Sequence, residues 1–119
     1  NGDVLVDGSM VGDINEIVLR DREMLAQEGL VIVTVVVDIN KHKIVSDPVV
    51  VAKGLIISEN LDNVLEEVGD ITADTINAAL KSKYIEWSEV KNNLHDKIAK
   101  RLYGITKKNP IVMPTIINV

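Results

Sequence analysis

The chain has 119 residues and a net charge of −5, and 46% of its residues are hydrophobic, which is enough to build one folded domain with a core. Aromatic side chains make up only 3% and cysteine is absent, so the composition excludes disulfide scaffolds, thiolate zinc sites and cysteine nucleophiles. No apolar run approaches the roughly 20 residues of a membrane span, and the polar start shows no signal-peptide pattern. Because the chain starts with Asn1 and not with Met, we expect a fragment of a longer protein.

The first predicted elements are a short strand at 4–6 and a helix within 12–29. Asp13 stands at the N-cap position of this helix, and Gly29 ends it. The helix contains the charged stretch 20–22 (Arg-Asp-Arg), whose two arginines point in different directions and do not form one clamp. Two readings stay open for this stretch: a structural or contact role, which we favour, and a site of chemistry.

The middle of the chain predicts two strands joined by the polar turn NKHK. A nearly continuous β-branched run, LVIVTVVVDIN, predicts a strand at 30–39, and KIVSDPVVVAKGLII predicts another at 43–57. Since the first run is apolar on both faces, we expect a central strand that is covered on both sides or paired across an interface. Pro48 marks a strand start or a bulge, and Gly54 marks a further irregularity.

Two helices and a strand complete the pattern, at 60–82, 87–106 and 111–118. Asn60 is a suitable N-cap, and Pro114 predicts an edge position or a bulge in the last strand. The expected buried positions are Leu61, Val64, Leu65, Val68, Ile76, Ala79 and Leu80 on the first helix, and Trp87, Val90, Leu94, Ile98, Leu102 and Ile105 on the second. The predicted fold class is therefore α/β, with a small, mainly three-stranded sheet packed by two helices and preceded by a strand–helix linker segment.

The chain offers no credible catalytic, cofactor-binding or metal-binding residues. Its two histidines, His42 and His95, have no metal-ligand spacing, and Glu66 and Glu67 fall on solvent-facing helical positions. The turn VDGSMVGD has two glycines but lacks the pattern of a phosphate-binding loop. We expect no active site in this chain by itself.

Charge is unevenly distributed along the chain. Residues 1–80 carry 15 acidic and 5 basic side chains, whereas residues 81–119 carry 3 acidic and 8 basic ones. The basic end offers candidate RNA contacts, although aromatic residues are scarce there and plain solvation is the favoured reading. The candidate RNA-contacting residues are Lys97, Lys100, Arg101, Lys107 and Lys108.

Several stretches resemble bacterial ribonuclease J. GDVLVDGSMVGDINEIVLRDREMLAQEGLVIV is similar to the segment that leaves the catalytic region of that family and enters its C-terminal domain. KIVSDPVVVAKGLI resembles the KIVSGP strand of the family, and EWSEVKNNLHDKIAKRLYGITKKNPIVMPTIINV resembles its final helix and proline-containing terminal strand. The resemblance implies that residues 1–29 are the end of the catalytic region and a linker helix, and that residues 30–119 are the C-terminal α/β domain.

The resemblance also implies a function for the parent protein. The family consists of cytoplasmic ribonucleases with a metallo-β-lactamase fold and a β-CASP domain, which degrade RNA from its 5′ end or cut it internally in messenger RNA decay and ribosomal RNA maturation. Zinc or manganese is implied for the parent enzyme. The metal motifs of the family are absent from these residues, so the fragment alone is expected to be inactive.

The resemblance implies that this C-terminal domain serves subunit association and supports the full activity of the enzyme. The expected partner is another ribonuclease J subunit, in a homo- or hetero-oligomer, and no membrane is involved. Residues 108–110 (Lys-Asn-Pro) depart from the Arg-Arg-Pro of the family, and residues 52–57 lack its aromatic side chains, which suggests the second, less active paralogue. The candidate interface residues are Val31, Val33, Val35, Val37, Ile111, Met113 and Ile116.

Three functional hypotheses follow, in order of preference. The first is an assembly module that associates through apolar strands. The second is an RNA-contacting module that uses the basic C-terminal helix, and its affinity would fall steeply with salt. The third is an independent small enzyme, against which the absence of clustered catalytic residue types argues.

Overall fold

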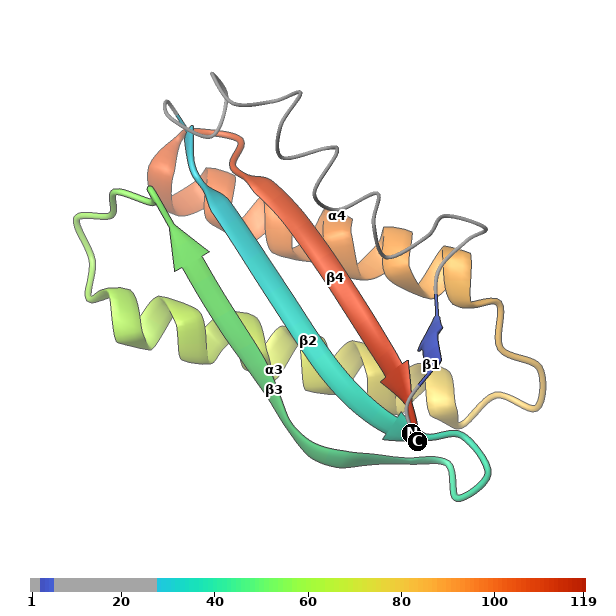
Figure 1. Cartoon of the computed structure of the whole chain (residues 1–119). Coiled ribbons are helices and arrows are strands. Elements are labelled where there is room, and N and C mark those ends of the chain that lie inside the picture. The colour runs from blue at the N-terminus through green and yellow to red at the C-terminus, as the bar shows by residue number, and fades with distance from the viewer. Residues whose placement is uncertain (1–2, 6–27) are drawn as a thin grey trace.

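The computed structural model describes residues 3–5 and 28–119, so most of the helix predicted within 12–29, including its charged stretch 20–22, lies outside the described residues. In the described part, a four-stranded sheet forms one layer and two helices form the other (Figure 1). The strands are β1 (Asp3–Leu5), β2 (Leu30–Asp38), β3 (Lys43–Lys53) and β4 (Ile111–Asn118), and the helices are α3 (Leu61–Leu80) and α4 (Trp87–Thr106).

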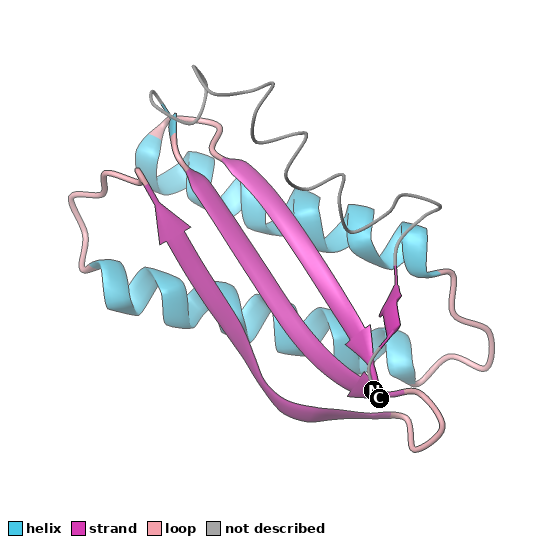
Figure 2. Ribbon diagram, viewed as in Figure 1, coloured by secondary structure: helices cyan, strands magenta, loops and turns pink. Residues whose placement is uncertain are grey.

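The strands lie in the order β1-β4-β2-β3. Strand β2 pairs antiparallel with β3 through a tight hairpin and parallel with β4, while β1 pairs antiparallel with the last three residues of β4. A parallel pair requires a long crossover connection, which α3 and α4 supply. Both helices lie on the same side of the sheet (Figure 2). The predicted α/β class, with three long strands and two helices, is confirmed, and β1 adds a short fourth strand.

Local signals in the sequence set several boundaries of these elements. The side chain of Asn60 accepts a hydrogen bond from the backbone N–H of Asn63 at 3.1 Å, which caps α3 as predicted. The register of β2 and β3 shifts between Thr34 and Val36, beside the segment that contains Pro48, so this proline marks a bulge. Strand β3 ends before Gly54, whose φ of 67° lies in the left-handed region.

In the described part of the chain, strand β4 has a neighbouring strand on both sides only at its C-terminal end. It pairs with β2 along its whole length, whereas β1 covers only Ile116–Asn118. Pro114 therefore lies in a part of β4 that has β2 on one side and no described strand on the other. This position suits a residue that cannot donate a backbone hydrogen bond, and it agrees with the predicted edge character.

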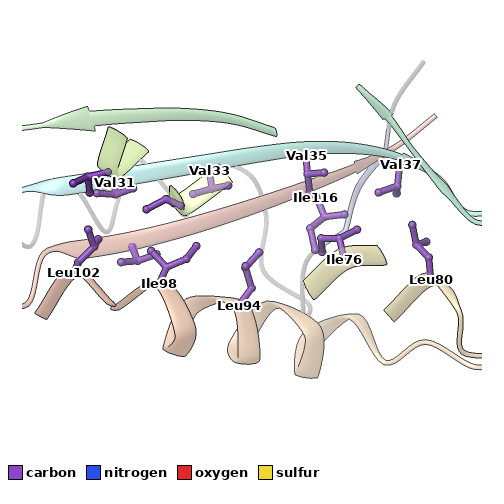
Figure 3. Close-up of a cluster of buried hydrophobic side chains, with 13 residues drawn as sticks. Val31, Val33, Val35, Val37, Ile76, Leu80, Leu94, Ile98, Leu102 and Ile116 are labelled. Carbon is purple, nitrogen blue, oxygen red and sulfur yellow. The ribbon is translucent and has the colours of Figure 1, made fainter. Parts of the chain in front are cut away.

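The core lies between the sheet and the helices. The side chains of Val31, Val33, Val35 and Val37 point from β2 toward the helices, where they meet Leu94, Ile98 and Leu102 of α4 and Ile76 and Leu80 of α3 (Figure 3). Helix α3 packs mainly on β3, and α4 packs mainly on β4. A helix carries one apolar stripe and a strand alternates its faces, so this packing buries one face of the sheet.

The predicted stripe of α3 needs two corrections. Leu61 is 41% exposed because the buried positions of the helix begin only at Val64. The stripe also includes the buried residues Thr72 and Thr75, which an apolar pattern cannot detect. The hydroxyl of Thr72 donates to the carbonyl oxygen of Val68 at 2.8 Å, so its burial leaves no unsatisfied polar atom.

Candidate functional site

The side of the sheet away from the helices carries a row of uncharged side chains along its three long strands. Because paired residues on neighbouring strands point to the same face, the residues of β2 that alternate with the buried valines share this side with their partners on β3 and β4. We call the middle of this surface the open face, and it consists of Ile32, Thr34, Val36, Val49, Val51, Met113, Thr115 and Ile117, while the charged residues Asp38, Lys43 and Lys53 lie on the same side at its two ends. None of these eight residues is charged, so the open face is suited to burial against another apolar surface.

Exposure is uneven across the open face. On β3, Val49 is 59% exposed and Val51 is 44% exposed, whereas Met113 on β4 is buried. Ile32, Thr34 and Val36, which lie on β2 between them, are half-buried. The part of the open face that solvent reaches most easily is therefore its β3 side, at the edge of the sheet.

The structure separates the candidate interface residues into two groups. Val31, Val33, Val35, Val37 and Ile116 are at most 1% exposed and lie in the domain's own core, so in this fold they cannot contact a partner directly. Ile111 and Met113 point to the other side of the sheet with the open-face residues. A run such as LVIVTVVVD is apolar on both faces, and its pattern alone does not tell which face meets the helices.

The basic helix α4 is tied to the acidic helix α3. The Nε of Arg101 donates to Oε1 of Glu67 at 2.8 Å, and both side chains are about two-fifths exposed. This hydrogen bond, together with the negative charges of Glu67 and Glu59, raises the pKa of the Arg101 guanidinium above its ordinary value, although partial burial opposes the shift. Arg101 thus contributes to the contact between the helices rather than presenting an unpaired charge.

The other candidate RNA contacts are spread over α4 and its C-terminal end. Lys97 donates to the hydroxyl of Thr75 at 3.5 Å, a second polar contact between the helices, while Lys100 is exposed. Lys107 adopts the left-handed C-cap position, with its ammonium 5.7 Å from the centre of the Tyr103 ring. The backbone N–H of Lys108 donates to the hydroxyl of Thr106 at 3.0 Å. The structure therefore does not gather these five residues into one unpaired patch.

Acidic side chains on α3 further weaken the positive field of α4. Helix α3 carries five acidic residues and no basic one, and it packs beside α4. Between α3 and β3 lies a shallow cleft of about 410 Å³ whose lining includes the carboxylates Asp47, Glu66 and Asp70. Glu66 faces this cleft while Glu67 faces Arg101, so the two adjacent glutamates are not a paired acid and base.

Both histidines have local partners. Nδ1 of His42 donates to the backbone carbonyl of Leu80 at 2.8 Å, which joins the β2–β3 turn to the last residue of α3. Nδ1 of His95 lies 3.0 Å from Oδ1 of the adjacent residue Asp96 on the exposed side of α4. The two histidines thus take part in two separate local contacts.

The described residues contain no group of three or more His, Asp or Glu side chains that could hold a metal ion. The metals that the family resemblance implies therefore find no fitting ligand set in this part of the chain, and no catalytic step is derived through them. Neither helix in the described ranges is long and apolar enough to cross a bilayer. The expected absence of an active site stays a prediction.

The described residues define a small α/β module in which α3 and α4 cover one face of the sheet and the open face lies on the other side. Residues 17–119 match the family model described as the ribonuclease J C-terminal domain. The chain belongs to this family, which confirms the resemblance seen in the sequence. The family match starts inside the segment 1–29, and the expected boundary between residues 29 and 30 stays a prediction.

The chain is similar to proteins named ribonuclease J 2 from two staphylococci. Ribonuclease J 2 of Staphylococcus aureus (strain NCTC 8325) is 36% identical over 116 residues, which covers 98% of this chain and 21% of that protein. Ribonuclease J 2 of Staphylococcus epidermidis (strain ATCC 35984) shows the same identity and coverage. The chain thus spans about a fifth of the length of these relatives.

Proposed function

We propose that this chain is the association module of a ribonuclease J-type enzyme, and that its partner is the same domain of another ribonuclease J subunit. The observation that carries the proposal is the open face, which is uncharged and most exposed at Val49 and Val51. Burial of such a surface is favourable at roughly 25 cal/mol per Å² of apolar area. Two such faces would pack as a sheet sandwich with an apolar interior.

The activity of the parent belongs to the same proposal. Relatives of the chain are named ribonucleases, so we infer that the complete protein is an RNA-degrading hydrolase of the cytoplasm, active in messenger RNA decay and ribosomal RNA maturation. Its metal-dependent centre, with zinc or manganese, would lie in the four-fifths of the relatives' length that this chain does not span. The name ribonuclease J 2 supports assignment to the second paralogue.

Light scattering on the 119-residue chain tests the association. The expected result is a dimer at low salt that persists at high salt, because apolar contacts are not screened by ions. The variant Val49→Lys/Val51→Lys should shift the molar mass toward the monomer, since it introduces two like charges where two copies would meet. Leu61→Lys is the matched control, because Leu61 is equally apolar and exposed but lies on α3 and not on the sheet.

Two results would contradict the proposal. One is a wild-type chain that is monomeric at every concentration and salt level. The other is an oligomer that the double lysine variant leaves intact while Leu61→Lys dissociates it, because association would then involve the helical side of the domain.

RNA contact by the basic helix α4 stays the alternative. The ion pair between Arg101 and Glu67 and the hydrogen bond between Lys97 and Thr75 reduce the positive charge that this helix can offer to phosphates. Salt separates the two functions, because RNA affinity would fall steeply with ionic strength whereas apolar association would not.

A further inference from the structure

Two loops that are far apart in sequence meet at one end of the domain. The hydrogen bond from Nδ1 of His42 to the carbonyl oxygen of Leu80, 2.8 Å long, joins the turn of the β2–β3 hairpin to the start of the α3–α4 loop. The hairpin turn is closed by the backbone N–H of His42, which donates to the carbonyl of Ile39 at 3.1 Å. Figure 1 shows the hairpin turn and the α3–α4 loop at the same end of the molecule.

Lysines are concentrated at this end, which we call the basic end. Two of them flank His42 and two follow Leu80, so the contact between His42 and Leu80 brings the two pairs together. Among the described residues, none of these four ammonium groups takes part in an ion pair. The basic end consists of Lys41, His42, Lys43, Lys81, Lys83 and Tyr84, all of them exposed.

The carboxylates of Asp38 and Glu86, which belong to the same two loops, accept hydrogen bonds from groups other than the lysine ammonium groups. Oδ1 of Asp38 accepts a hydrogen bond from the backbone N–H of Lys41 at 3.0 Å, so this carboxylate holds the hairpin turn together. Glu86 accepts from the hydroxyl of Ser88 at 3.0 Å at the start of α4. Within the two loops, residues 38–43 and 80–86, four lysines stand against these two carboxylates in a chain whose net charge is −5, while Asp3 and the terminal residue Val119 lie at the same end of the sheet beside β2. Such a local field attracts phosphates in spite of the overall negative charge.

Tyr84 adds an aromatic surface to this field. Its side chain is 85% exposed, which is the highest value among the large hydrophobic residues of the described part of the chain. The ammonium of Lys83 lies 5.7 Å from the centre of the ring. An aromatic ring that solvent reaches this freely gains nothing from the domain's own packing, and one of its uses is to stack against a nucleobase.

We propose that the basic end binds single-stranded RNA, with a base stacked on Tyr84 and phosphates held by the lysines of the two loops. Lysine contacts alone would suit any polyanion, but an aromatic platform next to separated ammonium groups matches a ligand that alternates bases and phosphates. A base must be unpaired to stack on a side chain, so the ligand is a single strand. The choice of RNA rests on the proposed function, in which the parent enzyme acts on RNA.

The chain contains a matched control for this proposal. Tyr103 has the ammonium of Lys107 at the same distance of 5.7 Å from its ring centre, but it is only 46% exposed. From Trp87 to Tyr103 the helix α4 rises about 24 Å, so the two tyrosines are too far apart to stack neighbouring bases. Tyr103 also belongs to the basic helix of the alternative function, so the comparison tests the two RNA surfaces against each other.

Fluorescence anisotropy with a labelled oligoadenylate measures the binding. The oligonucleotide has about 12 nucleotides, because this length fits a single-strand site. Tyr84→Ala should weaken the affinity of the 119-residue chain at low salt at least about fivefold, whereas Tyr84→Phe should retain it and Tyr103→Ala should leave it unchanged. Lys41→Ala and Lys83→Ala should each lower the slope of log K against log salt by about 0.7. Circular dichroism melting curves establish that the variants remain folded.

Four outcomes would overturn the proposal. They are an absence of RNA binding by the wild-type chain at low salt, an equal loss in Tyr84→Ala and Tyr103→Ala, equal affinity for the same strand annealed into a duplex, and binding to phosphatidylserine vesicles but not to RNA. Molar mass is measured on the same samples, so a failure of the association proposal is recognised separately. RNA binding that depends on Tyr84 supports the inference even when the chain is monomeric.

Discussion

Arg101 on α4 donates to Glu67 on α3 at 2.8 Å, so a basic residue that the sequence offers for RNA contact stabilises the packing of the two helices. The pair raises the pKa of the guanidinium above its ordinary value, mainly through this hydrogen bond. Because a raised pKa favours the bound proton in the folded state, the contribution of Arg101 to stability is fully present below the ordinary arginine pKa. It is lost only as the pH rises through the raised value.

Replacement of Arg101 should therefore affect stability more than RNA binding. We expect Arg101→Ala to lower the melting temperature slightly, because the pair is partly exposed and screened by solvent. Lys100→Ala is the control, since Lys100 is exposed and its loss should leave the melting temperature unchanged. Equal melting temperatures for Arg101→Ala and Lys100→Ala, measured by differential scanning calorimetry at low salt, would show that the pair contributes nothing.

A Cβ atom at Gly29 would lie 3.0 Å from the carbonyl oxygen of Gly54, and Gly29 has a φ of 99°. We expect Gly29→Ala to lower the free energy of unfolding by about 1–3 kcal/mol, because it adds both backbone strain and a steric conflict with main-chain atoms. At Gly69 in α3, the added Cβ would meet only Val50 at an ordinary 3.9 Å. Gly69→Ala should raise the free energy of unfolding by about 0.5–1 kcal/mol. Urea titration measures both variants, and a lower unfolding free energy for Gly69→Ala would count against the packing described for α3 and β3.

The assignment of the two sheet faces can be tested with paired truncations. Leu94 is fully buried between α4 and the sheet, so Leu94→Ala should cost about 2–5 kcal/mol of unfolding free energy. Val49 lies on the open face, and Val49→Ala should change this free energy by less than about 0.5 kcal/mol at a protein concentration where the chain is monomeric. Comparable costs at the two positions would mean that the open face is packed within the monomer.

The contact between His42 and Leu80 holds the hairpin turn against α3. Loss of this partly buried hydrogen bond in His42→Ala should lower the unfolding free energy by about 0.5–1.5 kcal/mol. His95→Ala, which removes only an exposed contact with the neighbouring Asp96, should cost less than about 0.5 kcal/mol. His42→Ala should also weaken RNA binding although every lysine remains, because the two loops of the basic end would no longer be held together. Unchanged RNA affinity in a destabilised His42→Ala variant would show that the loops act independently.

Local chemistry allowed most of the secondary structure to be predicted from the sequence. β-Branched runs predicted β2 and β3, Asn60 predicted the start of α3, and Pro114 predicted the partly unpaired edge of β4. These signals depend on neighbouring residues, on backbone restrictions and on periodicity, all of which the sequence contains. The spacing of Leu94, Ile98 and Leu102 likewise predicted the buried side of α4.

The functional surfaces depended on information that no local pattern contains. The run 30–37 is apolar on both faces, so only the packing of α3 and α4 decided that the odd-numbered valines form the core and that the even-numbered residues face away from the helices. Arg101 donates to Glu67, which lies 34 positions away in sequence, and only the packing of α4 beside α3 brings these two side chains together.

The basic end shows the same division most clearly. Composition and spacing predicted the α/β class and the opposed charges of residues 1–80 and 81–119, because those properties are sums over neighbouring residues. The tertiary structure alone decided that the lysines around His42 lie beside those that follow Leu80, because a hydrogen bond joins segments 38 positions apart. Chain connectivity does not determine such a contact, which forms only when the packed core places the hairpin turn against the end of α3.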